Sequence, residues 1–341
     1  MKLTLIQAVS LSLAAVTASY AVADVPVGIV IHGGAGTIER SQMSNEQQKH
    51  YEATLAEAVN KGYELLAAGG SSLDAVTLAV TVLENSPLFN AGKGAVYTWD
   101  ETHELDAAIM TGHDRNAGAV ASVTTVKNPI LLARAVMEKS DHVMLTGKGA
   151  EQFALAQQLE QVDNRYFNTE FRYEALKRAK QAQQPLPHQA AIVPDPNWKM
   201  GTVGAVAIDS KGNLAAATST GGMTAKRWGR VGDVPVLGAG NFADNTSCAV
   251  SGTGHGEYFI RYNVASDICA RVKYQGKNAA LAAKEVIAEL LQAGGTGGVI
   301  VVDAQGELSW AFNTPGMYRA KRDQAGTVIE IFADESEKAG N

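Results

Sequence analysis

Several features that mark large classes of proteins are missing from this chain of 341 residues. Its two cysteines are too few for a disulfide framework and lack the spacing of a metal site. It contains no basic run, and its net charge of −6 gives no reason to expect binding to nucleic acids or to anionic membranes. After the first residues, no apolar segment is long enough to span a bilayer. These absences argue against a disulfide scaffold, a zinc module, a nucleic-acid-binding protein and an integral membrane protein.

What is present is enough apolar material for a substantial core. Hydrophobic residues make up 46% of the chain, and its length allows one large domain or two modest ones. The 34 glycines cluster at turns and loops rather than in a low-complexity tract. The two cysteines, Cys248 and Cys269, could pair in an oxidising compartment, but we expect them to be two buried or unpaired thiols.

The first 23 residues are typical of a secretory signal. Lys2 provides the positive start, a modest apolar stretch follows, and an A-x-A cleavage motif at 21–23 precedes Asp24. A membrane anchor is the alternative, but polar residues interrupt the stretch and no stop-transfer flank follows. The sequence therefore predicts signal cleavage and export, to a bacterial periplasm.

Hydrophobic periodicity and turn residues outline the secondary structure. Apolar residues at 26–31 predict a short strand that leads into a glycine-rich turn. A capping-box pattern at 44–47 predicts a helix that ends near Gly69, and a second helix begins at Ser72. Beyond it, the pattern predicts strands around 94–99, 105–110 and 117–125, and helices near 129–138 and 146–161.

The composition changes over residues 165–200, which are charged and glutamine-rich and then proline-bearing. This segment predicts a fraying helix that runs into an exposed linker ending at residue 201. After it come two hairpins of the same design, at 203–219 and 299–312, with helices at about 257–271 and 278–292 between them. Strands with helices before and after them predict an α/β protein in stacked layers, with two sheets between helices.

The most informative feature is the dipeptide Gly201-Thr202 at the head of an apolar run. If the bond between the two residues breaks, Thr202 becomes a chain end whose free amine lies beside its own hydroxyl. A hydroxyl alone is a poor nucleophile, whereas an α-amine with a pKa of about 8 can accept its proton near neutral pH. Gly201 has no Cβ and so permits a close approach to its carbonyl. The alternative is a strand that begins after a glycine turn.

Motifs elsewhere in the chain favour the nucleophile. They are HGGAG at 32–36, LENSPLFNAGKG at 83–94, ELDA at 104–107, TSTGGM at 218–223, GRVGD at 229–233 and SGTGHGE at 251–257. Together they resemble the plant-type L-asparaginases and isoaspartyl peptidases, a family of N-terminal-nucleophile (Ntn) hydrolases. The resemblance covers nearly all of the chain after about residue 25. It implies a four-layer αββα Ntn-hydrolase sandwich, self-cleavage into an α subunit (24–201) and a β subunit (202–341), and a homodimer of cleaved protomers.

The resemblance implies a role for each residue of the predicted site. Thr202 matches the nucleophile, which attacks first the carbonyl of Gly201 and later the substrate amide. An amino-acid substrate needs a cationic fork for its carboxylate and an anion for its amine, and Arg230 and Asp233 match these groups. The remaining matches are Thr220, which tunes the nucleophile; Thr253 and Gly254, the oxyanion pair, which also bind substrate; Gly256, a substrate-binding position; and Asn90, which orients the surroundings of the nucleophile.

Structural alternatives stand beside these roles. Thr220 could simply end a strand, and Arg230 and Asp233 could be a solvated loop pair. The segment 251–257 could be a strand-to-helix turn, although a helix N-terminus also offers free N–H groups to an anion, so both interpretations can hold.

A possible structural sodium ion is also implied by the resemblance, and no cofactor for catalysis. By position, its ligands are backbone carbonyls, which suit a hard cation whatever the side chains are. The alternative is a helix C-terminus closed by Pro87 and a glycine turn. The matching residues are Leu83, Glu84, Ser86, Phe89, Ala91 and Lys93.

Two departures from the family pattern bear on substrate preference. His255 stands where the family often has a small or hydroxyl residue, and a bulky basic run at 225–228 precedes Gly229. Other catalytic motifs are missing, because the sequence has no G-x-S-x-G elbow of a serine hydrolase and no P-loop. The G-x-G-x-G at 252–256 does not match the dinucleotide fingerprint.

The sequence therefore predicts an exported amidohydrolase, active on L-asparagine and β-aspartyl dipeptides through an acyl-enzyme on the threonine. Its expected partners are a small-molecule or dipeptide substrate and a second copy of the chain, with no nucleic acid and no membrane after signal cleavage. The alternatives are a glycosylasparaginase-like hydrolase and a non-catalytic periplasmic amino-acid-binding protein.

Overall fold

The computed structural model describes residues 26–182 and 201–334. The predicted signal segment, 1–23, and residues 183–200 of the predicted linker lie outside the described residues. The described part is a mixed α/β fold with two sheets, one of eight strands and one of four. This confirms the predicted α/β class.

The large sheet contains the first six and the last two strands of the described residues, and the small sheet contains the four strands between them. The large sheet contains β1 (Gly28–Gly36), β2 (Leu105–Thr111), β3 (Ala117–Val123), β4 (Met144–Thr146), β5 (Val203–Ile208), β6 (Leu214–Thr220), β11 (Gly316–Asp323) and β12 (Gly326–Phe332). The small sheet contains β7 (Asn241–Ala243), β8 (Cys248–Gly254), β9 (Gly297–Asp303) and β10 (Leu308–Phe312). Their orders are β12-β11-β1-β5-β6-β2-β3-β4 and β10-β9-β8-β7, and only β3 and β4 pair in parallel.

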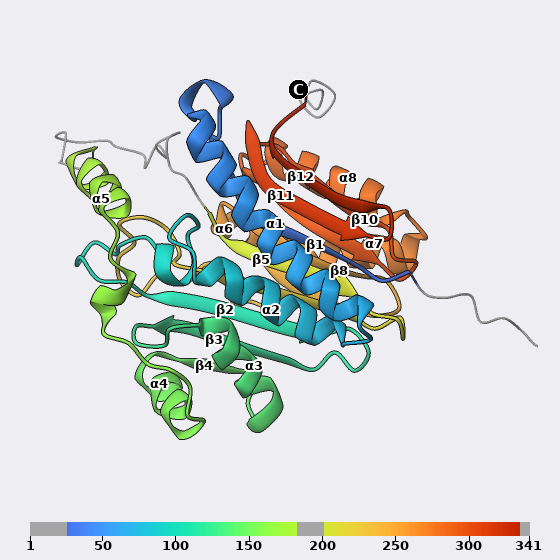
Figure 1. Ribbon diagram of the computed structural model, residues 1–341, viewed down its shortest axis with the longest axis horizontal. Coiled ribbons are helices and arrows are strands. Elements are labelled where there is room, and N and C mark those ends of the chain that lie inside the picture. The colour runs from blue at the N-terminus through green and yellow to red at the C-terminus, as the bar shows by residue number, and fades with distance from the viewer. Residues whose placement is uncertain (1–25, 183–200, 335–341) are drawn as a thin grey trace, which may run out of the picture.

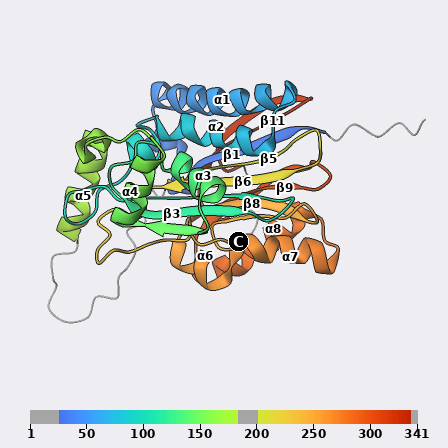
Figure 2. The same cartoon turned by 90° about the horizontal axis from the view of Figure 1, so that it is seen from below.

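Helices cover the outer faces of the sheets. Figure 1 shows the first two helices lying across the large sheet, and Figure 2 shows the helices after β8 beneath the small sheet. The described residues form α1 (Asn45–Ala67), α2 (Ser72–Glu84), α3 (Pro129–Lys139), α4 (Gly147–Ala156), α5 (Glu170–Ala182), α6 (Gly256–Tyr262), α7 (Val264–Gln275) and α8 (Ala279–Gln292). None of the helices within 26–182 and 201–334 is long and apolar enough to cross a membrane.

The centre of the large sheet is buried on both faces because the central strands are apolar at successive positions. Ile29 and Ile31 of β1 belong to the core shared with α1 and α2, whereas Val30 between them belongs to the core shared with the small sheet. This is the two-residue alternation of a strand, with an apolar side chain on each face. The centre of the large sheet is therefore closed to solvent on both sides, and its reactive groups lie at strand ends.

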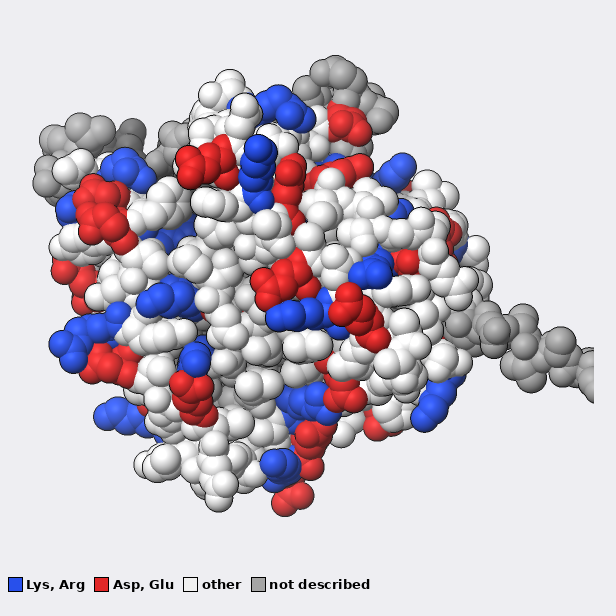
Figure 3. All heavy atoms as spheres, viewed as in Figure 1, with Lys and Arg blue, Asp and Glu red and all other residues white. Residues whose placement is uncertain are grey.

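The small sheet is buried in the same way. Val299 and Val301 of β9 pack with residues of α7 and α8, whereas Ile300 and Val302 face the large sheet. The described residues thus contain three apolar cores around the sheets, one on each side of the large sheet and one outside the small sheet, and a fourth, smaller cluster of Tyr97, Ala225 and residues of α5. On the face seen in Figure 3, acidic and basic side chains are interspersed, without a broad basic surface.

The predicted helix starts are confirmed. Ser44 caps α1 through a full capping box, in which its hydroxyl accepts from the N–H of Gln47 and the Gln47 side chain accepts from the N–H of Ser44. Ser71 caps α2 by accepting from the N–H of Asp74 at 3.1 Å. These caps fix the two helices that cover the large sheet.

The prediction of a glycine-rich turn after the first strand is wrong, because β1 continues through these glycines to Gly36. The strand accommodates the glycines with a bulge, and its pairing with β11 shifts between His32 and Gly34. Gly33 is required here, since a Cβ at this position would overlap the ring of Phe89. The bulge directs the segment 32–35 between the two sheets, next to the predicted site.

Several other element predictions need correction. Residues 94–99 form no strand, because the turn Gly92–Gly94 is followed by an irregular segment. The helix predicted over 257–271 is broken at Asn263, which adopts a left-handed conformation with φ of 48°. The helix predicted near 146–161 ends at Ala156. The hairpin of β11 and β12 and the short strands β4 and β7 were not predicted.

The expectation of two buried or unpaired thiols needs correction: Cys248 and Cys269 are buried, but they form a disulfide. Cys248 lies on β8 and Cys269 on α7, and both are buried in the core outside the small sheet. The packing of the helix on the strand places their Cα atoms 5.3 Å apart, within the range of a disulfide. With 21 residues of separation, the bond stabilises the fold by about 3 kcal/mol through loop closure. Separation in the sequence alone could not reveal this contact.

The segment before residue 183 packs against the rest of the fold. Phe167 is buried, and Arg172 of α5 is buried with its Nε donating to the carbonyl of Gly94 at 2.8 Å. A hydrogen bond therefore ties α5 to the loop that follows α2.

Candidate active site

The hairpin of β5 and β6 brings the first two predicted residues together. Val203 pairs with Ser219, so the next residues, Thr202 and Thr220, meet at the end of the hairpin. The hydroxyl of Thr202 donates to the hydroxyl of Thr220 at 3.2 Å, and both residues are buried. The short turn at 209–212 joins the two strands and sets this register.

Asn90 connects Gly201 of the Gly201–Thr202 junction to the segment that follows Thr220. Its backbone N–H donates to the carbonyl of Gly201 at 3.0 Å, and its own carbonyl accepts from the N–H of Gly221 at 3.1 Å. Its side-chain amide donates to the carbonyl of Gly222 at 2.7 Å and accepts from Val96. If the Gly201 carbonyl were attacked, negative charge would develop on its oxygen, and the N–H of Asn90 points at this oxygen.

The predicted oxyanion residues lie at the end of β8. Thr253 is fully buried, and its hydroxyl accepts from the N–H of Ala35 at 3.4 Å. Gly254 follows with φ of 149°, and a Cβ there would overlap the carbonyl of Thr296. The strand end therefore requires glycine at 254 and leaves a backbone N–H free of side-chain bulk.

Arg230 and Asp233 lie beside the first turn of α6. A Cβ on Gly256 would be 2.8 Å from Nη2 of Arg230 and 2.8 Å from Oδ1 of Asp233, so only glycine fits between the helix start and this pair. The Arg230 guanidinium makes a bidentate ion pair with Glu257, through Nε to Oε1 at 3.0 Å and Nη2 to Oε2 at 3.1 Å. The structure brings Gly256, Arg230 and Asp233 together, and Glu257 is a partner that the sequence reasoning did not identify.

Asp233 carries an unusual charge environment. It is buried, and its Oδ2 has no hydrogen-bond partner among the described residues. Burial raises the pKa of Asp233 to about 7, while the neighbouring Arg230 lowers it and the carboxylates of Glu257 and Asp106 raise it further. A cation placed beside the unpartnered oxygen would favour the ionised form. This is what a substrate ammonium group would do.

A pH dependence follows from Asp233. We expect KM for L-asparagine to rise as the pH falls below about 7, because a protonated Asp233 cannot pair with the ammonium group. A pH profile of kcat/KM for the wild type and for Asp233→Asn would measure this, and the variant should lose the acidic limb. An unchanged limb in the variant would assign it to another group.

The same shift makes the stability of the substrate-free protein depend on pH. Because the pKa of Asp233 is raised above 3.8 in the folded protein, this carboxyl stabilises the fold at low pH, where it is protonated. Its contribution to the free energy of unfolding is lost as the pH rises towards about 7.

Two buried carboxyls near the site were not identified as side chains from the sequence. Asp106 lies opposite Thr220 in the β2–β6 pairing, and its Oδ2 has no hydrogen-bond partner in the described ranges. Glu84 accepts from the hydroxyl of Ser219 at 2.7 Å, next to Thr220. Burial raises the pKa of Glu84 to about 7, although Ser219, Asn128 and the N–H of Ile130 oppose the shift. Only the motifs LENSP and ELDA hinted at these residues.

The predicted sodium segment is a compact turn after α2. Gly92 and Gly94 lie so close to the carbonyls of Glu84 and Phe89 that a Cβ on either would overlap them. Inward-facing carbonyls are the donor type that a hard cation takes. The described residues contain no cluster of three or more His, Cys, Asp or Glu that could hold a metal ion by side chains.

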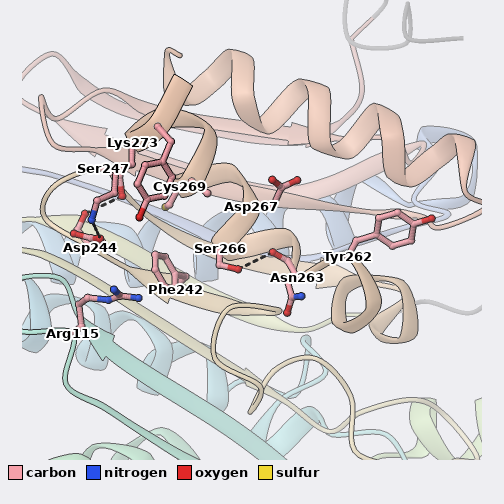
Figure 4. A pocket seen from close by; sticks show the side chains of 12 residues that line it. Arg115, Phe242, Asp244, Ser247, Tyr262, Asn263, Ser266, Asp267, Cys269 and Lys273 are labelled. Carbon is pink, nitrogen blue, oxygen red and sulfur yellow. Dashed lines mark hydrogen bonds and ion pairs between the residues drawn. The ribbon is translucent and has the colours of Figure 1, made fainter. Parts of the chain in front are cut away.

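A cavity of about 410 Å³ lies away from this constellation, between β7 and α7. Figure 4 shows its lining, where Lys273 pairs with Asp244 and Arg115 faces Phe242. None of the predicted site residues lines it. We therefore place the candidate chemistry at the strand ends around Thr202.

Fold and site together define a two-sheet α/β protein with a threonine pair at a glycine junction. Residues 25–330 match the family model described as asparaginase, and the chain belongs to this family. It is 55% identical over 294 residues to the isoaspartyl peptidase of Escherichia coli (strain K12), covering 86% of this chain and 91% of that protein. It is 44% identical over 310 residues to the isoaspartyl peptidase/L-asparaginase of Xenopus laevis, covering 90% and 96%. The corresponding protein of Bos taurus is 43% identical over 314 residues, covering 90% and 97%.

Proposed function

We propose that this protein is an isoaspartyl peptidase and L-asparaginase that hydrolyses β-aspartyl dipeptides and L-asparagine through an acyl-enzyme on Thr202. The observation that supports this most directly is the buried contact of 3.2 Å between the hydroxyls of Thr202 and Thr220 at the glycine junction. Membership of the asparaginase family and the names of the relatives support the same reaction class.

Maturation would begin at the Gly201 carbonyl. The hydroxyl oxygen of Thr202 bonds to the carbonyl carbon, the peptide C–N bond breaks, and the nitrogen takes the hydroxyl proton. Water then hydrolyses the resulting ester and leaves a free amine on Thr202. The N–H of Asn90, 3.0 Å from the Gly201 oxygen, would stabilise the negative charge of this step.

The two proposed subunits, 24–201 and 202–341, would stay associated after cleavage. In the large sheet β1 pairs with β5 and β11, and β2 pairs with β6. Strands of the two subunits are therefore neighbours at several places in one sheet. Separation of the subunits would break the hydrogen bonds between these strands and expose the apolar cores on both faces of the sheet.

Catalysis would use the freed amine as a base. It takes the Thr202 proton, Oγ1 bonds to the amide carbon of the substrate, the C–N bond breaks, and the departing ammonia or amino acid takes the proton. Water then releases aspartate. Thr253 and Gly254 would donate to the oxyanion, where the loss of one such donor typically costs about 3–4 kcal/mol. Arg230 and Asp233 would bind the carboxylate and ammonium of the substrate beside Gly256.

We also infer that the layers form the αββα sandwich of the Ntn hydrolases. The support is the order of the cores, with α1 and α2 on the large sheet, the small sheet on its other face, and α7 and α8 beyond. A homodimer of cleaved protomers rests on the family resemblance.

A structural sodium ion fits the turn after α2. The donor set would be the backbone carbonyls of that turn, and the close approach of Gly92 and Gly94 to two of them supports this fit. Such an ion would brace the loop that carries Asn90, and no chemical step passes through it. The carbonyls are those of Leu83, Glu84, Ser86, Phe89, Ala91 and Lys93.

Export with signal cleavage before Asp24 is the last part of the proposal. The disulfide between Cys248 and Cys269 supports it, because such bonds form and persist in oxidising compartments such as the periplasm.

One experiment tests maturation and activity together. N-terminal sequencing of the purified exported protein should give two starts, at Asp24 and at Thr202. The same sample should release ammonia from L-asparagine and aspartate from β-aspartyl-leucine. A single uncut chain with full activity would contradict the proposed nucleophile, and binding of L-asparagine without release of ammonia would indicate an amino-acid-binding protein instead.

A further inference from the structure

A chain of buried polar side chains connects the two sheets behind Thr202. The Nδ1 of His32 on β1 lies 2.9 Å from the carbonyl oxygen of Thr202, and its Nε2 lies 2.8 Å from the hydroxyl of Ser251 on β8. That hydroxyl lies 2.8 Å from the hydroxyl of Thr218 on β6, which accepts from the side-chain amide of Asn241 on β7 at 2.9 Å. His32, Ser251, Thr218 and Asn241 are all fully buried.

The direction of each hydrogen bond in this chain is fixed by chemistry. A carbonyl oxygen only accepts, so Nδ1 of His32 must carry a hydrogen. Burial lowers the pKa of His32 to about 3, so the ring is neutral and its Nε2 accepts from Ser251. Ser251 has one hydrogen, so in the 2.8 Å contact Thr218 donates to Ser251 rather than to the carbonyl of Gly240, which lies 3.4 Å away. All donors therefore point from Asn241 towards Thr202.

The bulge in β1 explains why a side chain, and not the strand backbone, donates a hydrogen bond to the carbonyl of Thr202. Regular pairing between β1 and β5 ends at His32 and Gly204, one residue before the bulge begins. The carbonyl of Thr202 lies beyond the last ladder pair, and the His32 ring donates to it in place of the strand backbone. Three residues later, the N–H of Ala35 donates to the hydroxyl of Thr253. One short segment of β1 thus contacts both the proposed nucleophile and the proposed oxyanion donor.

We propose that His32 is a positioning residue, which fixes the carbonyl of Thr202 through the ordered chain from Asn241, Thr218 and Ser251. The proposal rests on the proposed function of Thr202. Cleavage at the junction removes the covalent restraint on the nitrogen of Thr202. The remaining restraints are then its own strand, the contact to Thr220 and the bond from His32, so the new chain end keeps the direction that its hydroxyl needs.

The test compares variants of the full chain for self-cleavage, kcat and KM. In His32→Ala we expect cleavage and kcat to fall about tenfold, because the Thr202 carbonyl loses its donor, while KM stays within about twofold. His32→Asn should recover much of the loss, because its amide N–H can replace Nδ1–H. His103→Ala is the matched control, since His103 is also buried and donates Nδ1–H to a backbone carbonyl, that of Val96, at 3.1 Å. Its kcat should stay within about twofold.

Nitrogen-15 NMR of the histidine rings gives a readout that does not depend on activity. The expected signal for His32 is a neutral ring protonated at Nδ1. Ser251→Ala should shift the resonance of Nε2, which loses its donor, while Nδ1 keeps its hydrogen. A cationic or Nε2-protonated ring would overturn the proposal whatever the substrate, as would equal losses of kcat in His32→Ala and His103→Ala. Failure of the wild type to hydrolyse either substrate would instead refute the proposed function, with the ring state and the self-cleavage rate still deciding the role of His32.

Discussion

Thr202→Ala is expected to leave one uncut polypeptide and to lower hydrolysis of both L-asparagine and β-aspartyl-leucine by a factor of at least about 10⁴. The variant has no hydroxyl to attack the Gly201 carbonyl, so no amine is released to act as the base. A denaturing gel and parallel assays of the two substrates would measure both losses.

Thr202→Ser is the matched control for this variant. It keeps the hydroxyl and its contact with Thr220, and it removes only a methyl group from a buried position. We expect it to be cleaved and active, at lower rates than the wild type. Full cleavage or substantial hydrolysis in Thr202→Ala would remove Thr202 from the mechanism.

Arg230→Ala is expected to raise KM for L-asparagine about 10- to 100-fold while the fold stays intact. The bidentate pair with Glu257 shows that the guanidinium presents two donors in one plane, the geometry that a substrate carboxylate needs. Steady-state kinetics with L-asparagine would measure the change, and thermal unfolding would report on the fold.

Two further variants make the Arg230 result specific. Arg230→Lys keeps the charge but loses the planar fork, so we expect an intermediate KM. Arg165→Ala removes an exposed guanidinium that pairs only locally with Asp163, and it should leave KM unchanged. If Arg230→Ala left KM unchanged, the substrate carboxylate would have to bind elsewhere.

The parts of the site that lie on regular hairpins could be predicted from the sequence. The turn at 209–212 sets the register of β5 and β6, and the register brings Thr202 to Thr220. The segment 251–257 also indicated a strand-to-helix turn, and α6 begins there at Gly256. In each case a local pattern determines the geometry.

The parts that depend on contacts between distant segments could not be predicted. Whether HGGAG forms a turn or a bulged strand depends on pairing with β11, at the other end of the chain. The break at Asn263 and the disulfide depend on how α7 meets the small sheet. The pair of Arg230 with Glu257, and the chain behind Thr202, join residues that no local period relates.

The position of the disulfide has a consequence for how the processed protein behaves. Cys248 and Cys269 both follow Thr202, so the bond lies wholly within the C-terminal fragment. Only non-covalent contacts would then hold the two fragments, and a denaturing gel should resolve them equally well with and without a reducing agent. Reduction would loosen the link between α7 and β8, which carries Thr253, without releasing either piece.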